Sequence, residues 1–350
     1  GIAGSDEYRE RIASYISGDE DELIVASGDV TGGIILEDIR KSLKEFQVVF
    51  DEWFSEKSLY ESGKISETVM ALEKTSKLYE KDGAKWLKTS DYRDEKDRVV
   101  IREDGRPTYL ASDIAYHLDK YARGFDRFIN IWGADHHGYL PRIRASIEIL
   151  GNDPERLDVL FVQFVSLRRG GKLVQMSTRA GQFEELTGVV DEVGVDAARF
   201  FFLMRSPDSA LEFDLDLAKE ESSENPVYYV QYAHARTCSL FQQAEARGVS
   251  TGDLVEVPAG GLVLPEEHRL LRAILEWPGV VRTAAERLEP HRLPYALIAL
   301  AKRFHAYYNR NRILVDDPAV TRARLCLAKA VQAVAADGLK LLGVNAPEKM

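Results

Sequence analysis

The spacing of apolar residues changes near residue 225, and no other feature of the 350-residue chain limits its possible folds as strongly. Before that point, short apolar runs at 128–132 and 159–165 flank a stretch with helical spacing, which is the pattern of buried parallel strands joined by a helix. Beyond it, apolar residues recur every three or four positions. This spacing predicts helices at 228–246, 266–277, 280–288, 293–310 and 321–342. The chain should therefore fold as an α/β region followed by an all-α helical bundle.

Shorter elements are expected ahead of the sheet. They are an amphipathic helix at 34–46, a β-rich run at 48–50 and a helix-rich connector from Ser66. Residues 99–110 predict a hairpin around Asp104-Gly105, because Asp-Gly suits a turn that requires positive φ. Ser112 is expected to cap the helix that follows.

Composition indicates a folded protein of the cytoplasm. Hydrophobic residues make up 45% of the chain, enough for about two domains with their own cores, and no apolar run approaches the ~20 residues of a membrane span. Cys238 and Cys326 lie far apart, which argues against a disulfide framework or a cysteine-built zinc site and predicts two reduced core thiols. The net charge of -11 argues against a broad basic surface that coats nucleic acid. Phosphate binding needs only a local cluster, and one occurs near the C-terminus: Lys302, Arg303, Arg310, Arg312, Arg322 and Arg324.

The loop 132–138 follows the first predicted parallel strand, at the sheet edge where open parallel sheets bind ligands. Gly133 permits close approach of a flat ligand, while Asp135, His136 and His137 offer polar groups for ribose hydroxyls or a purine edge. Two other interpretations stay open. One is a metal site, although adjacent histidines diverge and no further Cys or His completes a ligand shell. The other is that both histidines bond only to backbone at a helix start.

Residues 172–181 follow the second predicted strand and combine a lysine, two hydroxyls and an arginine. A mobile loop of this kind suits triphosphate binding, because its donors can follow charge as it develops. A solvated loop with incidental Ser177, Thr178 and Arg179 explains the pattern at least as well.

Tyr109 and Asp113 lie four residues apart, where a strand is expected to give way to a helix. A carboxylate beside an aromatic hydroxyl suits a cationic side chain, and a guanidinium best, because of its planar fork. Asp113 is explained equally well by the preference of a helix's first turn for carboxylates.

The expected helix at 293–310 has an apolar face that includes Phe304 and Tyr308, with Arg303 and Arg310 on the opposite face. These cations either contact RNA or belong to an ordinary solvated helix face.

Six segments together resemble the bacterial class I arginyl-tRNA synthetases: 109–120, 131–138, 193–206, 213–219, 225–236 and 307–312. The similarity runs from about Ile34 to the last residue, and the ending 341–350 resembles the family's natural C-terminus. We therefore expect a native C-terminal boundary and an N-terminal one that is not native. The resemblance implies three regions: a remnant of an upstream region at 1–33, the second half of a Rossmann-like class I catalytic domain at 34–220 with its signature loop at 175–179, and a helical anticodon-binding domain at 221–350.

The resemblance also implies an arginine–tRNA ligase reaction. Arginine and ATP would give arginyl-adenylate and pyrophosphate, and the arginyl group would then pass to the terminal ribose of tRNA(Arg), with bound tRNA required for activation. No membrane partner, DNA partner or protein-built metal site is implied, and Mg²⁺ is expected to arrive with ATP. The implied arginine-binding residues are Tyr109, Asp113 and His137. The implied ATP-binding residues are Gly133, Asp135, His136, Met176, Ser177 and Arg179. The implied tRNA-binding residues are Tyr232, Tyr308, Asn309, Arg310, Arg312 and Met350.

Two departures from the family pattern limit this transfer. The signature loop has Gln175 and Thr178 where the family has lysines, so stabilisation of the triphosphate would depend on Arg179, Lys172 or residues elsewhere. None of the seven histidines forms the His-x-Gly-His motif that the family carries in the first half of its catalytic sheet. We therefore expect this chain alone to be catalytically incomplete.

Two other functions stay open. A non-catalytic tRNA-binding or regulatory protein derived from a synthetase would explain the missing motif, but it would not need the arginine-binding residue types at Tyr109 and Asp113. A class I synthetase for another amino acid would have this cation-binding pair in the wrong place.

Overall fold

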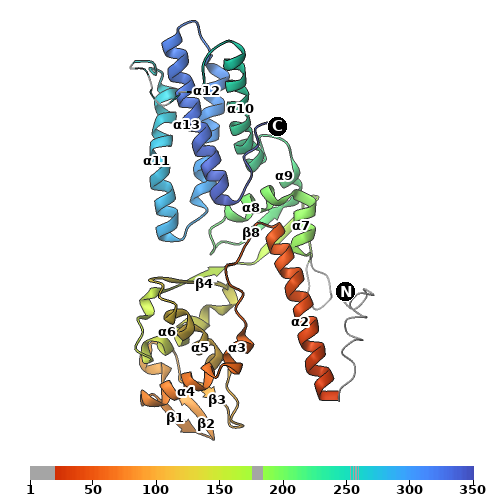
Figure 1. Ribbon diagram of the computed structural model, residues 1–350, viewed down its shortest axis with the longest axis vertical. Helices are drawn as coiled ribbons and strands as arrows, with labels where there is room; N and C mark the ends of the chain where they lie inside the picture. The colour runs from red at the N-terminus through yellow and green to blue at the C-terminus, as the bar shows by residue number, and fades with distance from the viewer. Residues whose placement is uncertain (1–19, 176–183, 253, 255, 257, 259) are drawn as a thin grey trace. The chain divides into compact units, whose positions relative to one another are not determined.

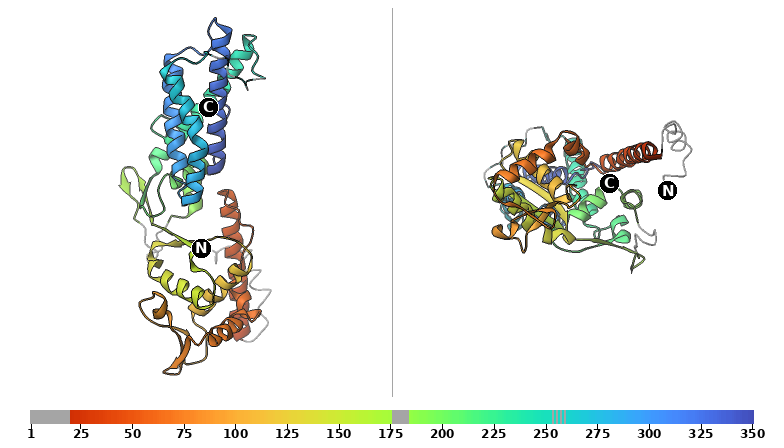
Figure 2. Two further views of the ribbon diagram at one scale, coloured as in Figure 1. Left: turned by 90° about the vertical axis from the view of Figure 1, so that its left-hand side faces the viewer. Right: turned by 90° about the horizontal axis from the view of Figure 1, so that it is seen from below.

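The computed structural model describes residues 20–175, 184–252, 254, 256, 258 and 260–350, which form two compact units (Figure 1, Figure 2). The sheet unit comprises Phe50–Ser166 and Arg205–Glu212. The bundle unit comprises Leu167–Met204 and Phe213–Met350, together with the residues up to Val49. No helix in the described ranges combines the length and the apolar character needed to cross a membrane.

The sheet unit opens with two helices and a three-stranded antiparallel sheet in the order β1-β2-β3. The elements are α3 (Glu56–Glu61), α4 (Lys64–Lys74), β1 (Leu78–Lys81), β2 (Ala84–Leu87) and β3 (Arg98–Ile101). Asp82 and Gly83 join β1 to β2 with φ of 52° and 74°, the double positive φ that matches the twist of a hairpin. The sequence analysis missed this hairpin, although Asp-Gly is its usual signal.

The expected hairpin at 99–110 is shorter than its pattern suggested. Its turn is confirmed, since Gly105 has a φ of 79° and the N–H of Arg102 donates to the carbonyl of Arg106 over 2.9 Å. The second arm is only the bridge from Ile101 to Pro107, and α5 (Tyr109–Ala122) starts at once.

Ser112 does not cap α5, as the sequence suggested, because the helix begins three residues earlier. Thr108 occupies the N-cap position, but its hydroxyl accepts no bond from the helix N–H groups and donates to the carbonyl of Val99. The hydroxyl of Ser112 donates to Glu56 over 2.7 Å.

The predicted parallel strands are confirmed as β4 (Phe128–Gly133) and β5 (Leu157–Val162), which pair residue by residue from Phe128–Leu157 to Gly133–Val162. Between them lies α6 (Leu140–Ile149). Helices α5 and α6 pack together over one core, which includes Ile114, Phe128, Ile143 and Leu157. The carboxyl ends of both strands, Gly133 and Val162, therefore lie side by side.

The bundle unit contains three short helices and most of a small sheet with the order β7-β6-β8, whose strands β6 and β8 begin in residues of the sheet unit. The elements are β6 (Val165–Arg169), β7 (Lys172–Leu173), α7 (Leu186–Val193), α8 (Val195–Leu203), β8 (Leu211–Asp214) and α9 (Leu215–Lys219). Helix α8 packs against α10 and α13 of the bundle, so the compact units divide the chain differently from the boundary at 220–221 that the sequence suggested.

The predicted bundle is confirmed, with four long helices: α10 (Pro226–Ala246), α11 (Pro265–Arg287), α12 (Arg292–Arg310) and α13 (Pro318–Leu342). The expected break between 277 and 280 is wrong, because α11 runs through Pro278. Proline costs a helix ~3 kcal/mol. Trp277 and Ala284, which are buried on either side of Pro278, show that packing of α11 against α12 and α13 outweighs this cost. Cys326 is buried as expected, whereas Cys238 is only partly buried.

The segment before Phe50 also differs from expectation. Helix α2 (Glu20–Glu45) begins well before residue 34, and the run 48–50 is not a strand. Gln47 adopts a φ of 59° and the N–H of Val48 donates to the carbonyl of Leu43 over 2.7 Å, a helix-ending motif that uses the backbone groups a strand would need. Val49 is left 79% exposed.

Candidate functional site

The edge where β4 and β5 end carries the exposed residues of the 133–138 loop, which folds as a 3-10 helix at Ala134–Tyr139. A Cβ at Gly133 would lie 2.5 Å from the Asp135 carboxylate, so a larger residue there would have to displace that exposed side chain. The ring of His137 stacks on Phe161 of β5 at 3.6 Å, and Nε2 of His136 lies 3.7 Å from Asp135. No three His, Cys, Asp or Glu side chains in the described part of the chain are grouped to hold a metal ion.

Asp113 lies on α5, and the hydroxyl of Tyr139, at the end of that 3-10 helix, donates to its carboxylate. Burial raises the pKa of Asp113, the bond from Tyr139 opposes that rise, and the charge of Glu56 adds to it. Burial and the bond to Asp113 also raise the pKa of Tyr139, so the phenol keeps its proton and remains a donor. The tyrosine thus fixes one carboxylate oxygen and leaves the other free to accept from a ligand.

A cavity of about 200 Å³ opens beside Asp113 and is lined by Phe54, Glu56, Leu59, Ser112, Asp113 and Tyr116. Two of these groups are carboxylates, and the rings of Phe54 and Tyr116 stack at 4.5 Å. Carboxylates beside stacked aromatic rings suit a planar cation. Tyr109, by contrast, is 77% exposed and does not line this cavity. The sequence analysis missed Glu56, whose only signal was its place in the first turn of a short helix.

A buried polar network lies behind Asp113 and joins α5 to β4. Nδ1 of His117 is 2.7 Å from the carbonyl of Asp113, and its Nε2 is 2.9 Å from the Asn130 amide, whose oxygen accepts from Lys120 over 2.8 Å. Burial lowers the pKa of His117 to about 4 and that of Lys120 to about 8. His117 is therefore neutral near pH 7, with Nδ1–H as donor and Nε2 as acceptor.

The signature loop falls mainly outside the described residues, which include Gln175 but not Met176, Ser177, Thr178 or Arg179. The hairpin that leads into it is firmly anchored. Arg169 pairs with Glu184 at 3.0 Å and with Glu192 at 2.7 Å, so one guanidinium links residues on both sides of the loop. The bond from Arg169, helped by Lys219, lowers the pKa of Glu192 to about 2.

On the bundle, a second cluster forms where α10 faces α12. The guanidinium carbon of Arg236 lies 4.6 Å from the centre of the Tyr232 ring and 4.9 Å from that of the Tyr308 ring. It donates to the Tyr232 hydroxyl, to Asn309 and to Nδ1 of His305 over 3.1, 3.2 and 3.1 Å. The sequence analysis named three of these residues but missed Arg236 and His305. The four-residue spacing from Tyr232 to Arg236 and from His305 to Asn309 was the available signal.

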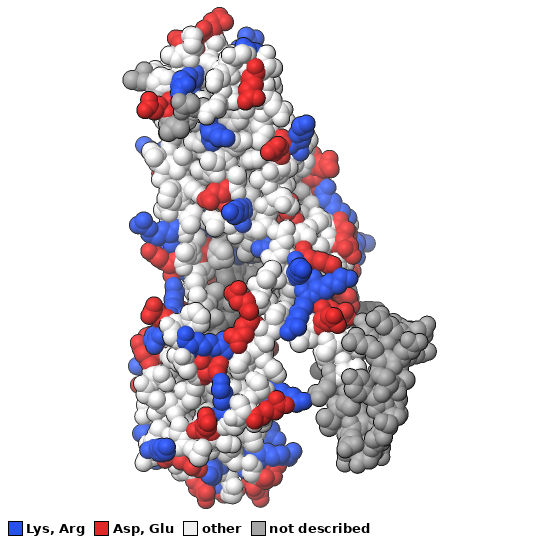
Figure 3. All heavy atoms as spheres, in the orientation of Figure 1, with Lys and Arg blue, Asp and Glu red and all other residues white. Residues whose placement is uncertain are grey.

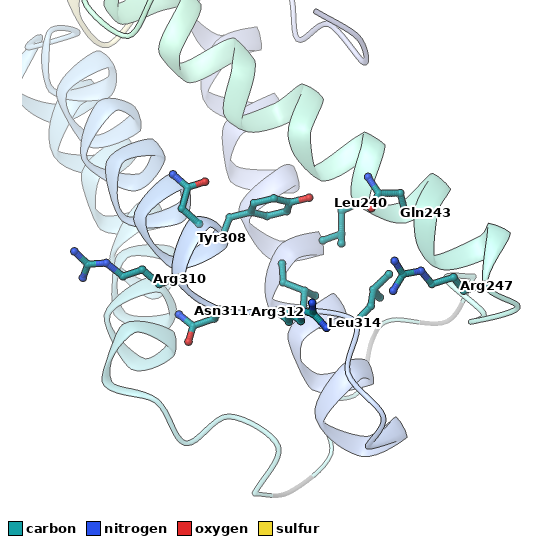
Figure 4. A pocket seen from close by; sticks show the side chains of 10 residues that line it. Leu240, Gln243, Arg247, Tyr308, Arg310, Asn311, Arg312 and Leu314 are labelled. Atoms are coloured by element: carbon teal, nitrogen blue, oxygen red, sulfur yellow. The ribbon is translucent and has the colours of Figure 1, made fainter.

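A cavity of about 370 Å³ lies next to this cluster, between the end of α10 and the segment after α12 (Figure 4). Its lining consists of Leu240, Gln243, Arg247, Tyr308, Asn309, Arg310, Asn311, Arg312, Ile313 and Leu314. Tyr308 points towards Leu240 across the cavity, whereas the guanidinium of Arg310 points away from it (Figure 4). The structure thus gathers four predicted tRNA-binding residues, Tyr308, Asn309, Arg310 and Arg312, around one hollow.

Met350 lines neither the cavity nor the Arg236 cluster. The C-terminal segment is nevertheless fastened to α10, since Gln231 donates to the carbonyl of Asn345 and His234 lies 2.9 Å from that of Pro347. On the face shown in Figure 3, basic and acidic side chains are interspersed, so no field of one sign covers it.

Comparison with known proteins links both parts of this geometry to one family. The family model described as "tRNA synthetases class I (R), catalytic domain" matches residues 6–215, and the one described as "DALR anticodon binding domain" matches residues 230–350. The arginine–tRNA ligase of Syntrophotalea carbinolica is 52% identical over 331 residues, covering 95% of this chain and 60% of that protein. That of Thioalkalivibrio sulfidiphilus is 52% identical over 319 residues, covering 91% and 54%.

Solved structures agree. The crystal structure of a putative arginyl-tRNA synthetase from Campylobacter jejuni superposes with a TM-score of 0.88 at 36% identity, covering 99% of this chain and 74% of that one. Thermus thermophilus arginyl-tRNA synthetase superposes with a TM-score of 0.78, covering 100% and 68%, and at 22% identity it shows likeness of fold. The chain spans 54% to 60% of the length of the two curated relatives.

Proposed function

Since this chain belongs to the arginyl-tRNA synthetase family, we propose that it is the part of an arginine–tRNA ligase that binds the arginine side chain and tRNA(Arg). The complete ligase would join arginine to ATP, release pyrophosphate and transfer the arginyl group to the terminal ribose of the tRNA. Such a reaction takes place in the cytoplasm, where tRNA is charged.

The observation that carries the arginine assignment is the cavity with two carboxylates, Glu56 and Asp113. We expect the free oxygen of Asp113 to accept from the guanidinium of arginine, which its planar fork and permanent charge suit for a charge-assisted bond. His137 and Tyr109, the other two arginine-binding residues that the family resemblance implies, would then contact arginine from the open side of the site. Their exposure leaves them accessible to a ligand.

ATP is the proposed second substrate. Gly133 lets a flat ligand approach the sheet edge, and Asp135 and His136 lie exposed beside it. Met176, Ser177 and Arg179 would contact the phosphates from the loop that Arg169 anchors. No described group of carboxylates could hold Mg²⁺ by itself, so the ion is proposed to enter bound to ATP.

The helical bundle is the proposed tRNA site. The tyrosine rings beside Arg236 provide surfaces on which unpaired RNA bases can stack. The adjacent cavity has three arginines in its lining, which provide hydrogen-bond donors. We expect Tyr232, Tyr308 and Asn309 to contact bases, Arg310 and Arg312 to contact phosphates, and Met350 to contribute from the segment fastened to α10.

The test replaces Arg310 and Arg312 by alanine in this chain and measures the affinity for a tRNA(Arg) transcript at several salt concentrations. Affinity should fall, and the salt slope should become shallower by about one unit for each lost phosphate contact. Arg303→Ala is the matched control, because Arg303 is exposed on the same helix and does not line the cavity. Wild-type affinity and slope in the double variant, with an unchanged melting temperature, would place the tRNA surface elsewhere.

A further inference from the structure

We propose that His305 is a positioning residue for RNA recognition: its unprotonated Nδ1 accepts from Arg236 and holds that guanidinium in the orientation that meets RNA. The inference rests on the proposed role of the bundle in tRNA binding. It goes further in assigning the acceptor that orients the arginine, and in making RNA affinity depend on pH.

Both ring nitrogens of His305 have fixed partners. Only 5% of the residue is exposed, and its Nε2 lies 3.1 Å from the carbonyl of Tyr229. A carbonyl can only accept, so Nε2 carries a proton. Nδ1 lies 3.1 Å from Nη1 of Arg236, which can only donate, so Nδ1 carries none. The two contacts together require the neutral tautomer with the proton on Nε2.

The other contacts of Arg236 show what His305 adds. Asn309 also accepts from Nη1, and the Tyr232 hydroxyl accepts from Nη2. The two tyrosine rings attract the guanidinium, but contact with a ring face does not fix how the planar group is rotated. Acceptors at its rim remove this freedom, and His305 is the most buried of them.

Arg236 keeps donors that these acceptors do not use. The contacts within the described part of the chain leave its Nε–H and one N–H of Nη2 without a partner. These two nitrogens share one edge of the planar group, and such an edge can donate two parallel bonds to a base or a phosphate. His305 therefore acts at the opposite edge from the one left for RNA.

Protonation of His305 would undo this arrangement. The polar groups that contact its ring come from Arg236, Tyr229 and Tyr232 of α10, and among the described residues Arg236 is the one charge that acts on it. Burial lowers the pKa of His305, the bond to Tyr229 opposes this, and the charge of Arg236 adds to the lowering. An imidazolium would offer Arg236 no acceptor and would repel its charge. Affinity for RNA should therefore fall as the pH drops below ~6.5 towards this lowered pKa.

The experiment measures binding of the whole chain to a fluorescent anticodon stem-loop transcript of an arginine tRNA, at constant ionic strength, from about pH 7.5 to about pH 5. The wild-type protein should lose affinity towards the acid end of this range, as His305 begins to take up a proton. His305→Asn can place an amide oxygen where Nδ1 lies and does not titrate, so its affinity should stay near the neutral wild-type value throughout. His305→Phe supplies no acceptor and should bind about tenfold more weakly at every pH.

Arg236→Ala separates this inference from the function on which it rests. If that variant binds the stem-loop as tightly as the wild type, Arg236 does not contact RNA and the inference is overturned, whereas the surface around Arg310 and Arg312 is tested by its own double variant. If it binds weakly while the wild type shows no more pH dependence than His305→Asn, the surface stands and the positioning role is overturned. Helical circular dichroism at both ends of the pH range confirms that each variant is folded, and His305→Asn keeps the test decisive if His305→Phe is not.

Discussion

At Asp113, burial and hydrogen bonding act on one carboxylate in opposite directions. Burial raises its pKa, whereas the bond from Tyr139 favours the ionised form. The negative charge of Glu56, which lines the same cavity, also raises the pKa of Asp113. A cationic ligand relieves both unfavourable effects, which is why a cavity with two carboxylates should prefer a guanidinium to a neutral side chain.

We expect Asp113→Asn, in a complete ligase that contains this chain, to raise the Michaelis constant for arginine about tenfold or more. The variant removes a charge-assisted bond worth ~1.5–3 kcal/mol, and nothing comparable at the ATP site. Steady-state kinetics with each substrate varied in turn measure the difference. An unchanged constant for arginine with altered ATP kinetics would reassign Asp113.

Tyr139→Phe should act on the same carboxylate without removing it. Loss of the phenol donor removes the main effect that opposes burial, so the pKa of Asp113 should rise further. Arginine binding needs the ionised form, and it should therefore be lost at a higher pH in the variant than in the wild type. The pH profile of kcat/KM for arginine reports this shift. Coincident acid limbs in the two proteins would show that Tyr139 does not tune Asp113.

The sequence could identify Asp113 because its neighbours in the chain carry a family pattern. It could not identify Glu56 or Tyr139 as its companions, since 57 and 26 positions along the chain separate them from Asp113 and only packing of α3, α5 and the strand-end loop brings them together. Arg236 and His305 could not be identified from the sequence for the same reason. Their partnership exists only once α10 lies against α12.

Among the helices, α11 starts at a residue that also ties the bundle together. The Glu267 carboxylate accepts from the N–H groups of Val263 and Leu264, both over 2.8 Å, and closes the helix start. It also accepts from Tyr307 of α12 over 3.0 Å and from Arg324 of α13 over 2.9 Å. Burial alone would raise the pKa of Glu267, but these four donors outweigh it and hold the pKa below its usual range.

Glu267→Gln should destabilise the bundle by about 3 kcal/mol, because it leaves Arg324 buried without its counter-charge. Urea unfolding followed by helical circular dichroism measures the loss. Glu266→Gln is the control next to it, since Glu266 pairs only with the largely exposed Arg269 and should change stability by no more than ~0.5 kcal/mol. A Glu267 variant as stable as its neighbour would contradict the role of this carboxylate.

The same contacts predict a pH dependence. A carboxylate whose pKa is lower in the folded state contributes stability above its unfolded value, ~4.3, and loses it as the pH falls through the folded value. The wild-type bundle should therefore lose stability between these two values more steeply than Glu267→Gln.

Element positions were predictable where apolar spacing was long and regular, as in α10, α12 and α13. The predictions failed where packing between distant segments outweighed a local signal, as at Pro278, or where a local signal was overlooked, as at Asp82-Gly83. The prediction of β structure at 48–50 failed for a third reason. Its β-branched valines favour a strand, but no neighbouring strand is available in the structure described to pair with it.

At the scale of the whole molecule, the residues proposed for catalysis are spread along the chain. Tyr109, Asp113 and the 133–138 loop belong to the sheet unit, whereas the hairpin that leads into the signature loop belongs to the bundle unit from Leu167 onward. Neither unit by itself therefore holds all of the residues proposed for ATP binding. The sequence also indicates that this chain lacks part of the ATP site, because none of its histidines forms a His-x-Gly-His motif.

We expect this chain by itself to bind tRNA(Arg) but not to form arginyl-adenylate. The proposed tRNA surface consists of residues of the bundle unit, whereas the chain spans 54% to 60% of the curated relatives and none of its seven histidines has the spacing of the His-x-Gly-His motif. The measurement is ATP–pyrophosphate exchange with arginine and tRNA present, alongside tRNA binding by the same preparation. A complete ligase that contains this chain serves as the positive control. Binding without exchange is the expected result. Adenylate formation needs cations and histidines positioned around the triphosphate. The 172–179 segment and the 133–138 loop supply some of these groups, but the His-x-Gly-His motif that would supply the others is not in this sequence. Exchange at a rate close to that of the complete ligase would show that these two segments are sufficient for the ATP site.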